Sequence, residues 1–234
     1  MQGCGRIKVS DILKQYKAGL EMEKIIQEYK TVFEDGSGEI VEKKSRFIAN
    51  VHHVESEEEA VTYIESLRKT YWDARHNCYA YIIGKNSEIT RCSDDGEPGG
   101  SAGKPILEIM LKEDLTNAVI VVTRYFGGVL LGTGGLVRAY GQAAKEGINH
   151  AVTGTMRLMN IMLVKIDYTL VGKVKYLLAK SEVDVINEQY EENVVFKIAV
   201  VINKKDSLCK ELSEATSGRI EVEEKDIQYI PKMN

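Results

Sequence analysis

The stretch from Arg124 to Tyr140, RYFGGVLLGTGGLVRAY, limits most strongly what this chain can fold into. A β-type run over residues 118–123 precedes it, and apolar residues at helical spacing, from Leu136 to Ile148, follow its glycines. Five glycines fall within nine residues, at Gly127, Gly128, Gly132, Gly134 and Gly135. Glycine tolerates positive φ and lets a ligand or another backbone approach closely. The pattern therefore predicts a strand, a loop with accessible amides and a helix.

Such a loop favours an anion, because the amides and the start of the following helix both carry partial positive charge. Arg124 and Arg138 add formal positive charge beside it. Standard nucleotide motifs do not match: GxGxxG fails at Val137, and the Walker pattern fails at Pro98 and Pro105. A tight strand-to-helix connection, with glycines that only allow close packing, remains the alternative interpretation.

A second dense stretch, SDDGEPGGSAGKP over residues 93–105, carries the carboxylates Asp94, Asp95 and Glu97 ahead of a short helix that Pro105 can begin. These carboxylates can hold Mg²⁺ on a phosphate with Arg124 as electrostatic partner, or form salt bridges that join the two loops. The second interpretation is slightly favoured, because the carboxylates repel a phosphate when no metal is present. We expect the two loops side by side, with Asp94 or Glu97 in hydrogen-bonding reach of Arg124 or of loop amides.

His76 and Cys78 lie two residues apart on an expected strand and share one face, the Cys/His pairing that most resembles a catalytic dyad. No separately placed carboxylate or amide orients the imidazole, so Cys78 is expected in the core. The four cysteines form no CxxC, and the four histidines are scattered. We therefore expect reduced thiols, no metal site and no cofactor.

Along the chain, strands are expected at residues 29–33, 39–54, 76–83 and 88–92, with a turn at 35–38 and a helix that Ser56 and Glu59 begin with a capping box. After Ala151 the order becomes β-α-β-β-α-β, the ferredoxin-like arrangement. We predict an amino-terminal extension over 1–21, either an upstream start or a flexible arm before Met22. Two domains are predicted after it, over 22–153 and 154–234.

Composition narrows the class of protein. A hydrophobic fraction of 44% and a charged fraction of 28% are those of an ordinary globular protein, and the net charge of −4 argues against indiscriminate binding to polyanions. No apolar run reaches the roughly 20 residues of a membrane span. The chain is thus expected in the cytoplasm, without a membrane partner and without DNA specificity.

Four segments together resemble the IMPACT/YigZ family: SRFIA at 45–49, ARHNCYAY at 74–81, and the two glycine-rich stretches at 93–105 and 124–140. The resemblance implies an α+β, two-domain fold. Its amino-terminal domain would be a ribosomal-protein-type left-handed βαβ domain, as in the fourth domain of elongation factor G, and its carboxy-terminal domain ferredoxin-like. Leu130 stands where many members have lysine, and Gly99 where serine is common.

In the same family, eukaryotic relatives act as translational regulators, and bacterial members are inferred to bind nucleic acid or ribosomes. The resemblance therefore implies a cytoplasmic regulator that binds RNA, ribosomes or a translation-regulatory protein. The expected binding surface combines the five glycines with cationic and aromatic residues, namely Lys104, Arg124, Tyr125, Phe126, Arg138 and Tyr140. The alternative, less favoured, is a phosphate-ester hydrolase or nucleotide-binding enzyme that uses Asp94, Asp95, Glu97 and Arg124.

Overall fold

The computed structural model describes residues 26–181 and 183–232, so the predicted extension over 1–21 lies outside the described residues. The described chain divides into two compact units, residues 28–156 and residues 157–232 with 26–27. The predicted domain ranges 22–153 and 154–234 stay a prediction. None of the helices in the described part of the chain has the length and hydrophobicity that crossing a membrane requires.

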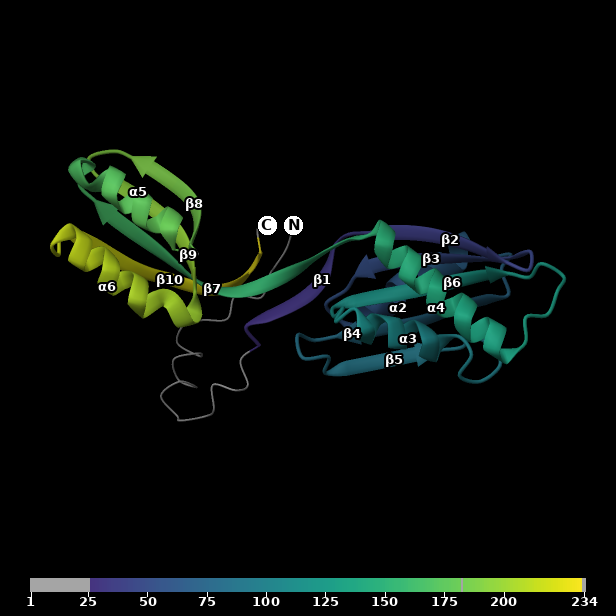
Figure 1. Ribbon diagram of the computed structural model, residues 1–234. Coiled ribbons are helices and arrows are strands. Elements are labelled where there is room, and N and C mark those ends of the chain that lie inside the picture. Colours follow the sequence, from purple (N-terminus) through teal and green to yellow (C-terminus); the bar gives the residue numbers. More distant parts are fainter. Residues whose placement is uncertain (1–25, 182, 233–234) are drawn as a thin grey trace. The chain divides into compact units, whose positions relative to one another are not determined.

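The first unit contains six strands and three helices (Figure 1). They are β1 (Glu28–Glu34), β2 (Gly36–Glu42), β3 (Ser45–His53), α2 (Glu57–Thr70), β4 (His76–Ile83), β5 (Ile89–Ser93), α3 (Gly103–Lys112), β6 (Ala118–Tyr125) and α4 (Thr133–His150). One sheet takes the order β2-β3-β6-β4-β5, and its neighbouring strands are antiparallel. Because β3 and β4 both run antiparallel to β6, they are parallel to each other. With α2 as the connection they form a βαβ unit, and β6 lies between the two strands.

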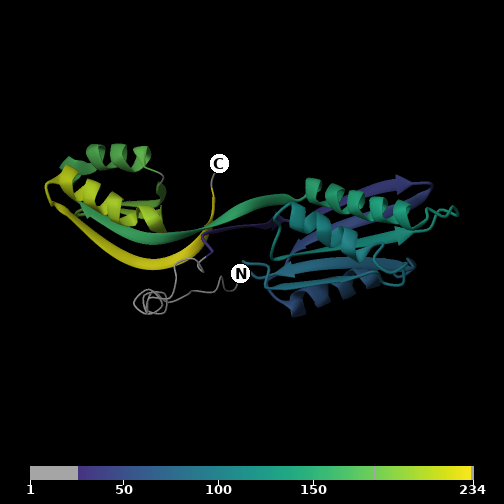
Figure 2. The ribbon, with the colours of Figure 1, turned by 60° about the horizontal axis from the view of Figure 1, so that its bottom comes forward.

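Helices cover both faces of this sheet, with α3 and α4 on one side and α2 on the other (Figure 2). Strand β6 shows why: Ile120 and Val122 point to the core under α3 and α4, and Val119 and Val121 point to the core under α2. A strand buried on both faces reads as a continuous apolar run, as residues 118–122 do. The strand predicted to lead into the glycines is therefore central.

The Ser56 half of the capping box predicted for α2 is confirmed. The Ser56 hydroxyl accepts from the Glu59 amide at 3.2 Å, which satisfies an amide that the first turn of a helix leaves without a partner. The Glu59 carboxylate accepts at 2.6 Å from the amide of Glu55, one residue before the N-cap, and not from the Ser56 amide of a standard capping box. The two contacts set where α2 begins.

The turn predicted at residues 35–38 is wrong. Gly36 and Gly38 lie within β2, and the chain reverses instead at Lys43 and Lys44, which have φ of 45° and 67°. A Cβ at Gly36 would lie 2.3 Å from the Ala151 nitrogen, and one at Gly38 would lie 2.8 Å from the Glu146 carbonyl carbon. These two glycines are present because β2 passes directly under the end of α4.

The second unit has the predicted ferredoxin-like element order. It contains β7 (Val152–Ile166, which begins in the first unit), η2 (Tyr168–Leu170), α5 (Val171–Lys180), β8 (Val183–Tyr190), β9 (Val194–Val201), η3 (Ile202–Lys204), α6 (Lys205–Thr216) and β10 (Ile220–Pro231). Strand β7 pairs with β9, and β9 with β8, while β10 and β1 also join β7. Helices α5 and α6 pack Val174, Leu178, Leu208 and Leu212 onto one face of this sheet. The α+β, two-domain fold class is thus confirmed.

Candidate functional site

The two glycine-rich loops meet at one end of residues 28–156. We call residues 94–102, between β5 and α3, the acidic loop, and residues 126–132, between β6 and α4, the glycine loop. The guanidinium of Arg124, next to the glycine loop, donates from Nη1 to Glu97 Oε1 of the acidic loop at 2.6 Å. The prediction that the loops lie side by side is confirmed, and the ion pair that joins them is the favoured of the two interpretations.

Arg124 is buried in this ion pair. Its side chain is 7% exposed and that of Glu97 is 4% exposed. The guanidinium carbon also lies 5.4 Å from the ring centre of Phe47 and 5.6 Å from that of Phe126. Its buried Nε has no hydrogen-bond partner among the described residues. The charge of Arg124 is therefore engaged inside the protein and does not face an external phosphate.

Tyr140 shares the same carboxylate. Its hydroxyl donates to Glu97 Oε1 at 2.8 Å, lies 3.3 Å from Cys78 Sγ, and belongs to a side chain with no solvent exposure. Burial, followed by the interactions with Cys78 and Glu97, raises the pKa of Tyr140 far above its ordinary value. A ring in the core cannot stack on a base, so the prediction that Arg124 and Tyr140 form an exposed binding face is wrong.

The position of Tyr140 could have been found from the sequence. It lies four residues after Leu136 and on the same helical face as Ala143 and Ala144, all of which are buried. The aromatic ring continues the apolar stripe by which α4 packs on the sheet. It packs edge-to-face with the Phe47 ring, and the two ring centres are 5.1 Å apart. Helical spacing was thus the better guide to this residue than its closeness to Arg138 in the sequence.

Asp94 is a structural cap for α3. Its Oδ1 accepts from the amides of Ala102 and Gly103, both at 2.9 Å, and its Oδ2 accepts from Gly100 at 2.7 Å. The N-cap residue of α3, Ala102, has no side chain that can cap the helix. Burial raises the pKa of Asp94, but the three amides outweigh burial and leave this pKa below its ordinary value. The carboxylate is ionised and occupied.

Asp95 connects the acidic loop to α2 and β4. Its Oδ1 accepts from Arg68 Nη2 at 2.8 Å, and its Oδ2 accepts from the Asn77 amide at 2.7 Å. The backbone of Asp95, at a φ of 42°, accepts from His76 Nδ1 at 2.8 Å. Sequence reasoning missed Arg68 and Asn77, because neither lies near the acidic loop in the sequence and no spacing connects them.

The contacts of the three carboxylates do not favour a metal-dependent enzyme. Each candidate, Asp94, Asp95 and Glu97, already accepts hydrogen bonds from two or more protein groups. Among the described residues, no group of three or more His, Cys, Asp or Glu side chains is arranged to hold a metal ion. Mg²⁺ would have to displace internal partners that position both loops.

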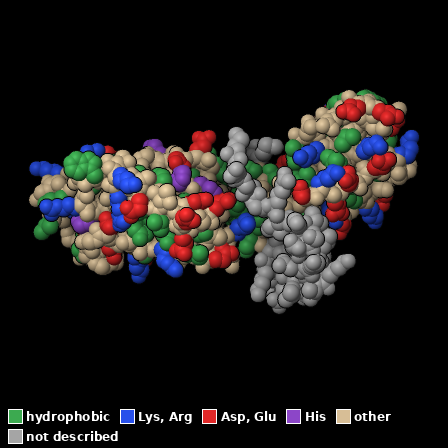
Figure 3. Space-filling model, turned by 180° about the vertical axis from the view of Figure 1, so that it is seen from behind, with side chains coloured by type: hydrophobic (Ala, Val, Ile, Leu, Met, Phe, Trp, Pro, Cys, Tyr) green, Lys and Arg blue, Asp and Glu red, His purple; other side chains and the backbone are tan. Residues whose placement is uncertain are grey.

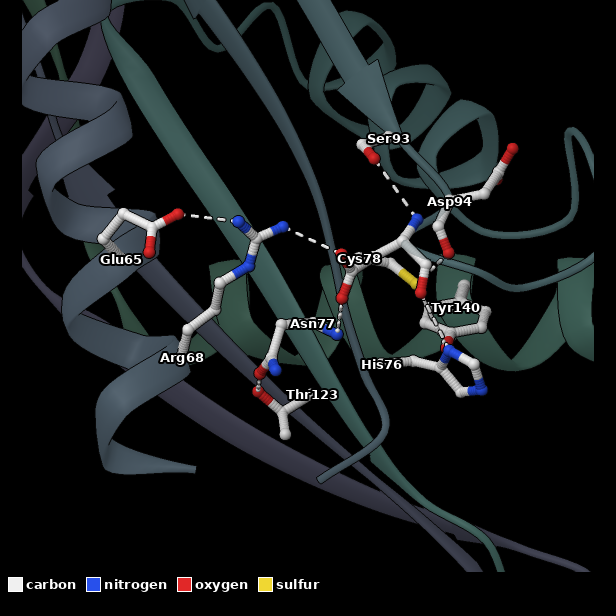
Figure 4. Close-up of polar contacts among 10 residues, drawn as sticks. Glu65, Arg68, His76, Asn77, Cys78, Ser93, Asp94, Thr123 and Tyr140 are labelled. Carbon is white, nitrogen blue, oxygen red and sulfur yellow. Dashed lines mark hydrogen bonds and ion pairs between the residues drawn. The ribbon is translucent and has the colours of Figure 1, made fainter. Parts of the chain in front are cut away.

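His76 and Cys78 form no catalytic pair. The imidazole of His76 donates to the acidic loop, while Cys78 has no solvent exposure, and its Sγ lies 2.9 Å from the Asp94 carbonyl oxygen (Figure 4). Burial, only partly offset by the Tyr140 hydroxyl, raises the pKa of Cys78 well above its ordinary value. A thiol held protonated in the core is a poor nucleophile, which agrees with the expectation that Cys78 is a core residue.

The five glycines of the stretch divide by structural role. A Cβ at Gly127 would lie 2.0 Å from the Lys44 carbonyl carbon, and one at Gly135 would lie 2.9 Å from the Leu131 Cβ, so both are needed for close packing. Gly128 and Gly132 have φ of 85° and 73° and nothing within 4 Å of an added Cβ. A Cβ at Gly134 would meet only Arg138 Nη1, at 3.7 Å. The packing interpretation therefore explains Gly127 and Gly135. It does not explain Gly128, Gly132 or Gly134, where an added Cβ would make no close contact.

The glycine loop projects past the ends of the strands (Figures 1 and 2). Several of its apolar side chains are exposed. Phe126 is 54% exposed, Val129 43% and Leu130 82%. Trp72, just after α2, is 81% exposed. Soluble proteins rarely gather such side chains at one place without a partner.

The remaining predicted residues lie around this loop. Tyr125 is half-buried: its hydroxyl donates to Asp73 at 2.7 Å, and the Arg46 guanidinium lies 5.7 Å from its ring centre. Arg138 and Lys104 are exposed, in α4 and in the first turn of α3. The side chains of both are without an ion pair in the described chain. Figure 3 shows Lys and Arg side chains together with hydrophobic ones at its left-hand end, which is the end of residues 28–156 that carries the glycine loop.

Comparisons with known proteins follow this division of the chain. Residues 43–148 match the Impact N-terminal domain, and residues 164–219 match a domain of unknown function, DUF1949. Over 208 residues the chain is 42% identical to IMPACT family member YvyE of Bacillus subtilis, covering 89% of this chain and 96% of that protein. It is 34% identical over 182 residues to IMPACT family member YigZ of Escherichia coli, covering 77% and 89%. A crystal structure of a hypothetical protein is 30% identical, with a TM-score of 0.56, and the match covers 85% of this chain and 97% of that one.

Proposed function

The chain belongs to the IMPACT family, and from this premise we propose that it is a cytoplasmic, translation-associated regulatory protein. It binds RNA, ribosomes or a translation-factor partner through the end of its first unit that carries the glycine loop. Relatives of this family in eukaryotes regulate translation, which is the activity that the resemblance implies. The function is one of binding and requires no catalytic step.

One observation carries this proposal: the glycine loop combines accessible backbone with exposed apolar side chains, and the exposed cations Lys104 and Arg138 lie in the helices that follow the two loops. The base of the two loops is rigid because the Arg124–Glu97 ion pair and the Tyr140 hydrogen bond hold both loops from below. Binding residues commonly lie on loops that a packed scaffold positions. The surface therefore differs from the predicted one: Phe126, Val129, Leu130 and Arg138 are available to a partner, whereas Arg124 and Tyr140 support them.

The enzyme alternative lacks comparable support. Its three carboxylates cap a helix, hold α2 and neutralise Arg124, and its proposed electrostatic residue is 7% exposed. A group that already satisfies the interior of a protein has little free capacity to stabilise a transition state. We therefore keep a single function.

Co-sedimentation with ribosomal particles tests the proposal. The parent protein should pellet with ribosomes at low salt and leave them at high salt, since exposed cations supply the attraction. The variant Arg138→Gln should pellet less than the parent at low salt and should leave the ribosomes at a lower salt concentration. Lys112→Gln is the matched control, because Lys112 is also exposed but lies at the far end of α3 from the acidic loop. Equal pelleting by parent, Arg138→Gln and Lys112→Gln would contradict the proposed surface.

A further inference from the structure

We propose that the end of the first unit binds RNA directly, with cations on the phosphates and the glycine loop against unpaired bases. The inference rests on the proposed function and narrows its partner to one chemical class. We define the tip surface as the exposed side chains that surround the glycine loop: Lys43, Lys44, Trp72, Arg75, Phe126, Val129, Leu130 and Arg138.

Three of the segments that form the tip surface touch one another. The β2–β3 turn lies against the glycine loop, since a Cβ at Gly127 would overlap the Lys44 backbone and the Gly127 amide donates to Ser45 Oγ at 3.1 Å. The segment after α2 joins them through the hydrogen bond between Tyr125 and Asp73 at 2.7 Å. Residues far apart in the sequence thus form one surface.

Its cations are uncompensated. Lys43, Lys44, Arg75 and Arg138 are exposed, and in residues 26–181 and 183–232 none of the four forms an ion pair. Of the nearby carboxylates, Glu97 pairs with Arg124, Asp95 with Arg68 and Glu39 with Arg46. Glu42 and Asp73 lie in the same segments as these cations, and the four cations outnumber them. A chain with a net charge of −4 therefore concentrates unpaired positive charge at one end. The positive charge of the tip surface favours an anionic partner, because the two potentials are complementary.

Arg138 gives that partner a place to bind. Its Nη1 lies 3.7 Å from the position of a Cβ at Gly134, so the guanidinium lies over the first turn of α4. Helix α4 has eighteen residues and begins at Thr133. Its N-cap residue, Gly132, offers no capping side chain, and its first turn has no acidic residue. A cation beside the positive end of a helix is unfavourable alone and becomes favourable when an anion lies between them.

The apolar part of the tip surface selects among anionic partners. Trp72 and Phe126 present exposed rings, Leu130 is 82% exposed, and the backbone at Gly128 and Gly132 faces open space. Planar bases stack on such rings, and the phosphates between them can approach a backbone that has no Cβ. An acidic protein does not offer planar rings in regular succession with its charges, as the bases and phosphates of RNA do. A flat anionic membrane would repel the rest of a negatively charged chain. RNA with unpaired bases fits both parts of the surface.

Naked RNA tests the inference separately from the ribosome. Filter binding with an unstructured single strand of about 16 nucleotides, a hairpin and a blunt duplex should show retention of the strand and the hairpin loop, and less of the duplex. Four phosphate contacts at about 0.7 each predict a slope near −3 for log K against log salt. The chain has one tryptophan, Trp72, so stacking should also quench its fluorescence.

Variants separate the two parts of the surface. Lys43→Asn, Lys44→Asn and Arg138→Gln should each weaken binding and reduce the slope by about 0.7, and asparagine tolerates the positive φ of the turn. Phe126→Ala should weaken binding about 5- to 150-fold with the slope unchanged, as expected for one lost base contact. Leu130→Ala should weaken binding without a change in slope. Leu111→Ala is its matched control, since Leu111 is 49% exposed in α3 outside the tip surface.

Each of several outcomes would overturn the inference. Ribosome pelleting without retention of any naked RNA would leave the proposed function standing and exclude direct RNA contact. Retention on vesicles that contain phosphatidylserine, but not on RNA, would show a membrane partner. Equal binding of duplex and single strand would exclude contact with unpaired bases. Loss of both ribosome pelleting and RNA retention in the parent would overturn the proposed function as well.

Discussion

The acidic loop and the glycine loop resemble each other in sequence and differ in structure. Both are rich in glycine and flank the same buried ion pair. In the acidic loop, Asp94, Asp95 and Glu97 all bind partners within the protein. In the glycine loop, Phe126 and Leu130 contact solvent and Gly128 faces open space. The comparison teaches that a glycine-rich loop becomes a scaffold when its side chains find partners inside the protein, and a surface when its side chains contact solvent.

Breaking the buried Arg124–Glu97 ion pair is the strongest test of the distinction between the scaffold loop and the surface loop. Glu97→Ala would leave Arg124 buried without its counter-charge, so the free energy of unfolding of the first unit should fall by roughly 3–5 kcal/mol. Urea unfolding followed by circular dichroism measures this change, fitted for two transitions because the chain has two units. Replacing both charges, as Glu97→Leu with Arg124→Met, should recover most of the loss. A loss below about 1 kcal/mol for Glu97→Ala would show that the pair does not hold the loops.

A pair of glycine variants tests the close approach of the glycine loop to the β2–β3 turn. Gly127→Ala should lower the free energy of unfolding by about 1–3 kcal/mol, because the new methyl group would overlap the Lys44 backbone. Gly134→Ala is the control, because only Arg138 lies near the new Cβ. It should leave stability unchanged or raise it by up to about 1 kcal/mol, since alanine favours the helix. Similar effects from both variants would contradict the assignment of roles.

The pH dependence of stability reports the Asp94 cap. The pKa of Asp94 is lowered in the folded protein from its ordinary value of 3.8. The carboxylate therefore stabilises the fold fully above pH 3.8, and this contribution is lost as the pH falls through the folded pKa. At neutral pH, Asp94→Asn should lower the free energy of unfolding by about 1 kcal/mol. This difference should shrink on acidification, and a constant difference would indicate that ionisation of Asp94 is not what caps α3.

The smallest effect on stability is expected in the glycine loop. Leu130→Ser should change the free energy of unfolding by no more than about 0.5 kcal/mol, because the side chain is 82% exposed. Ribosome pelleting by the same variant should fall. Leu111→Ser provides the comparison, as an exposed leucine outside the tip surface that should alter neither quantity. If Leu130→Ser lost stability instead of binding, the glycine loop would belong to the scaffold.

Much of the fold followed from patterns that act over short distances. The start of α2 at Ser56, the β-type run over residues 118–123 and the βαββαβ order that begins with β7 were all visible in the sequence. Periodicity determines which face of an element is apolar, and a cap needs only residues three positions apart. The sequence also placed the two loops together, and the 2.6 Å contact between Arg124 and Glu97 confirms that expectation.

What the sequence alone did not determine is which side of each loop faces water. Arg124 and Tyr140 have the chemistry of a binding surface, yet the tertiary structure buries both against Glu97, 27 and 43 residues away in the sequence. Likewise Asp95 finds Arg68 only because α2 and β4 pack together. Local sequence patterns cannot decide whether a polar side chain is buried. Desolvation makes a buried polar group without a partner costly, so burial depends on whether folding brings a partner to that group. Among the described residues, the charges without such a partner include Lys43, Lys44, Arg75 and Arg138 of the tip surface.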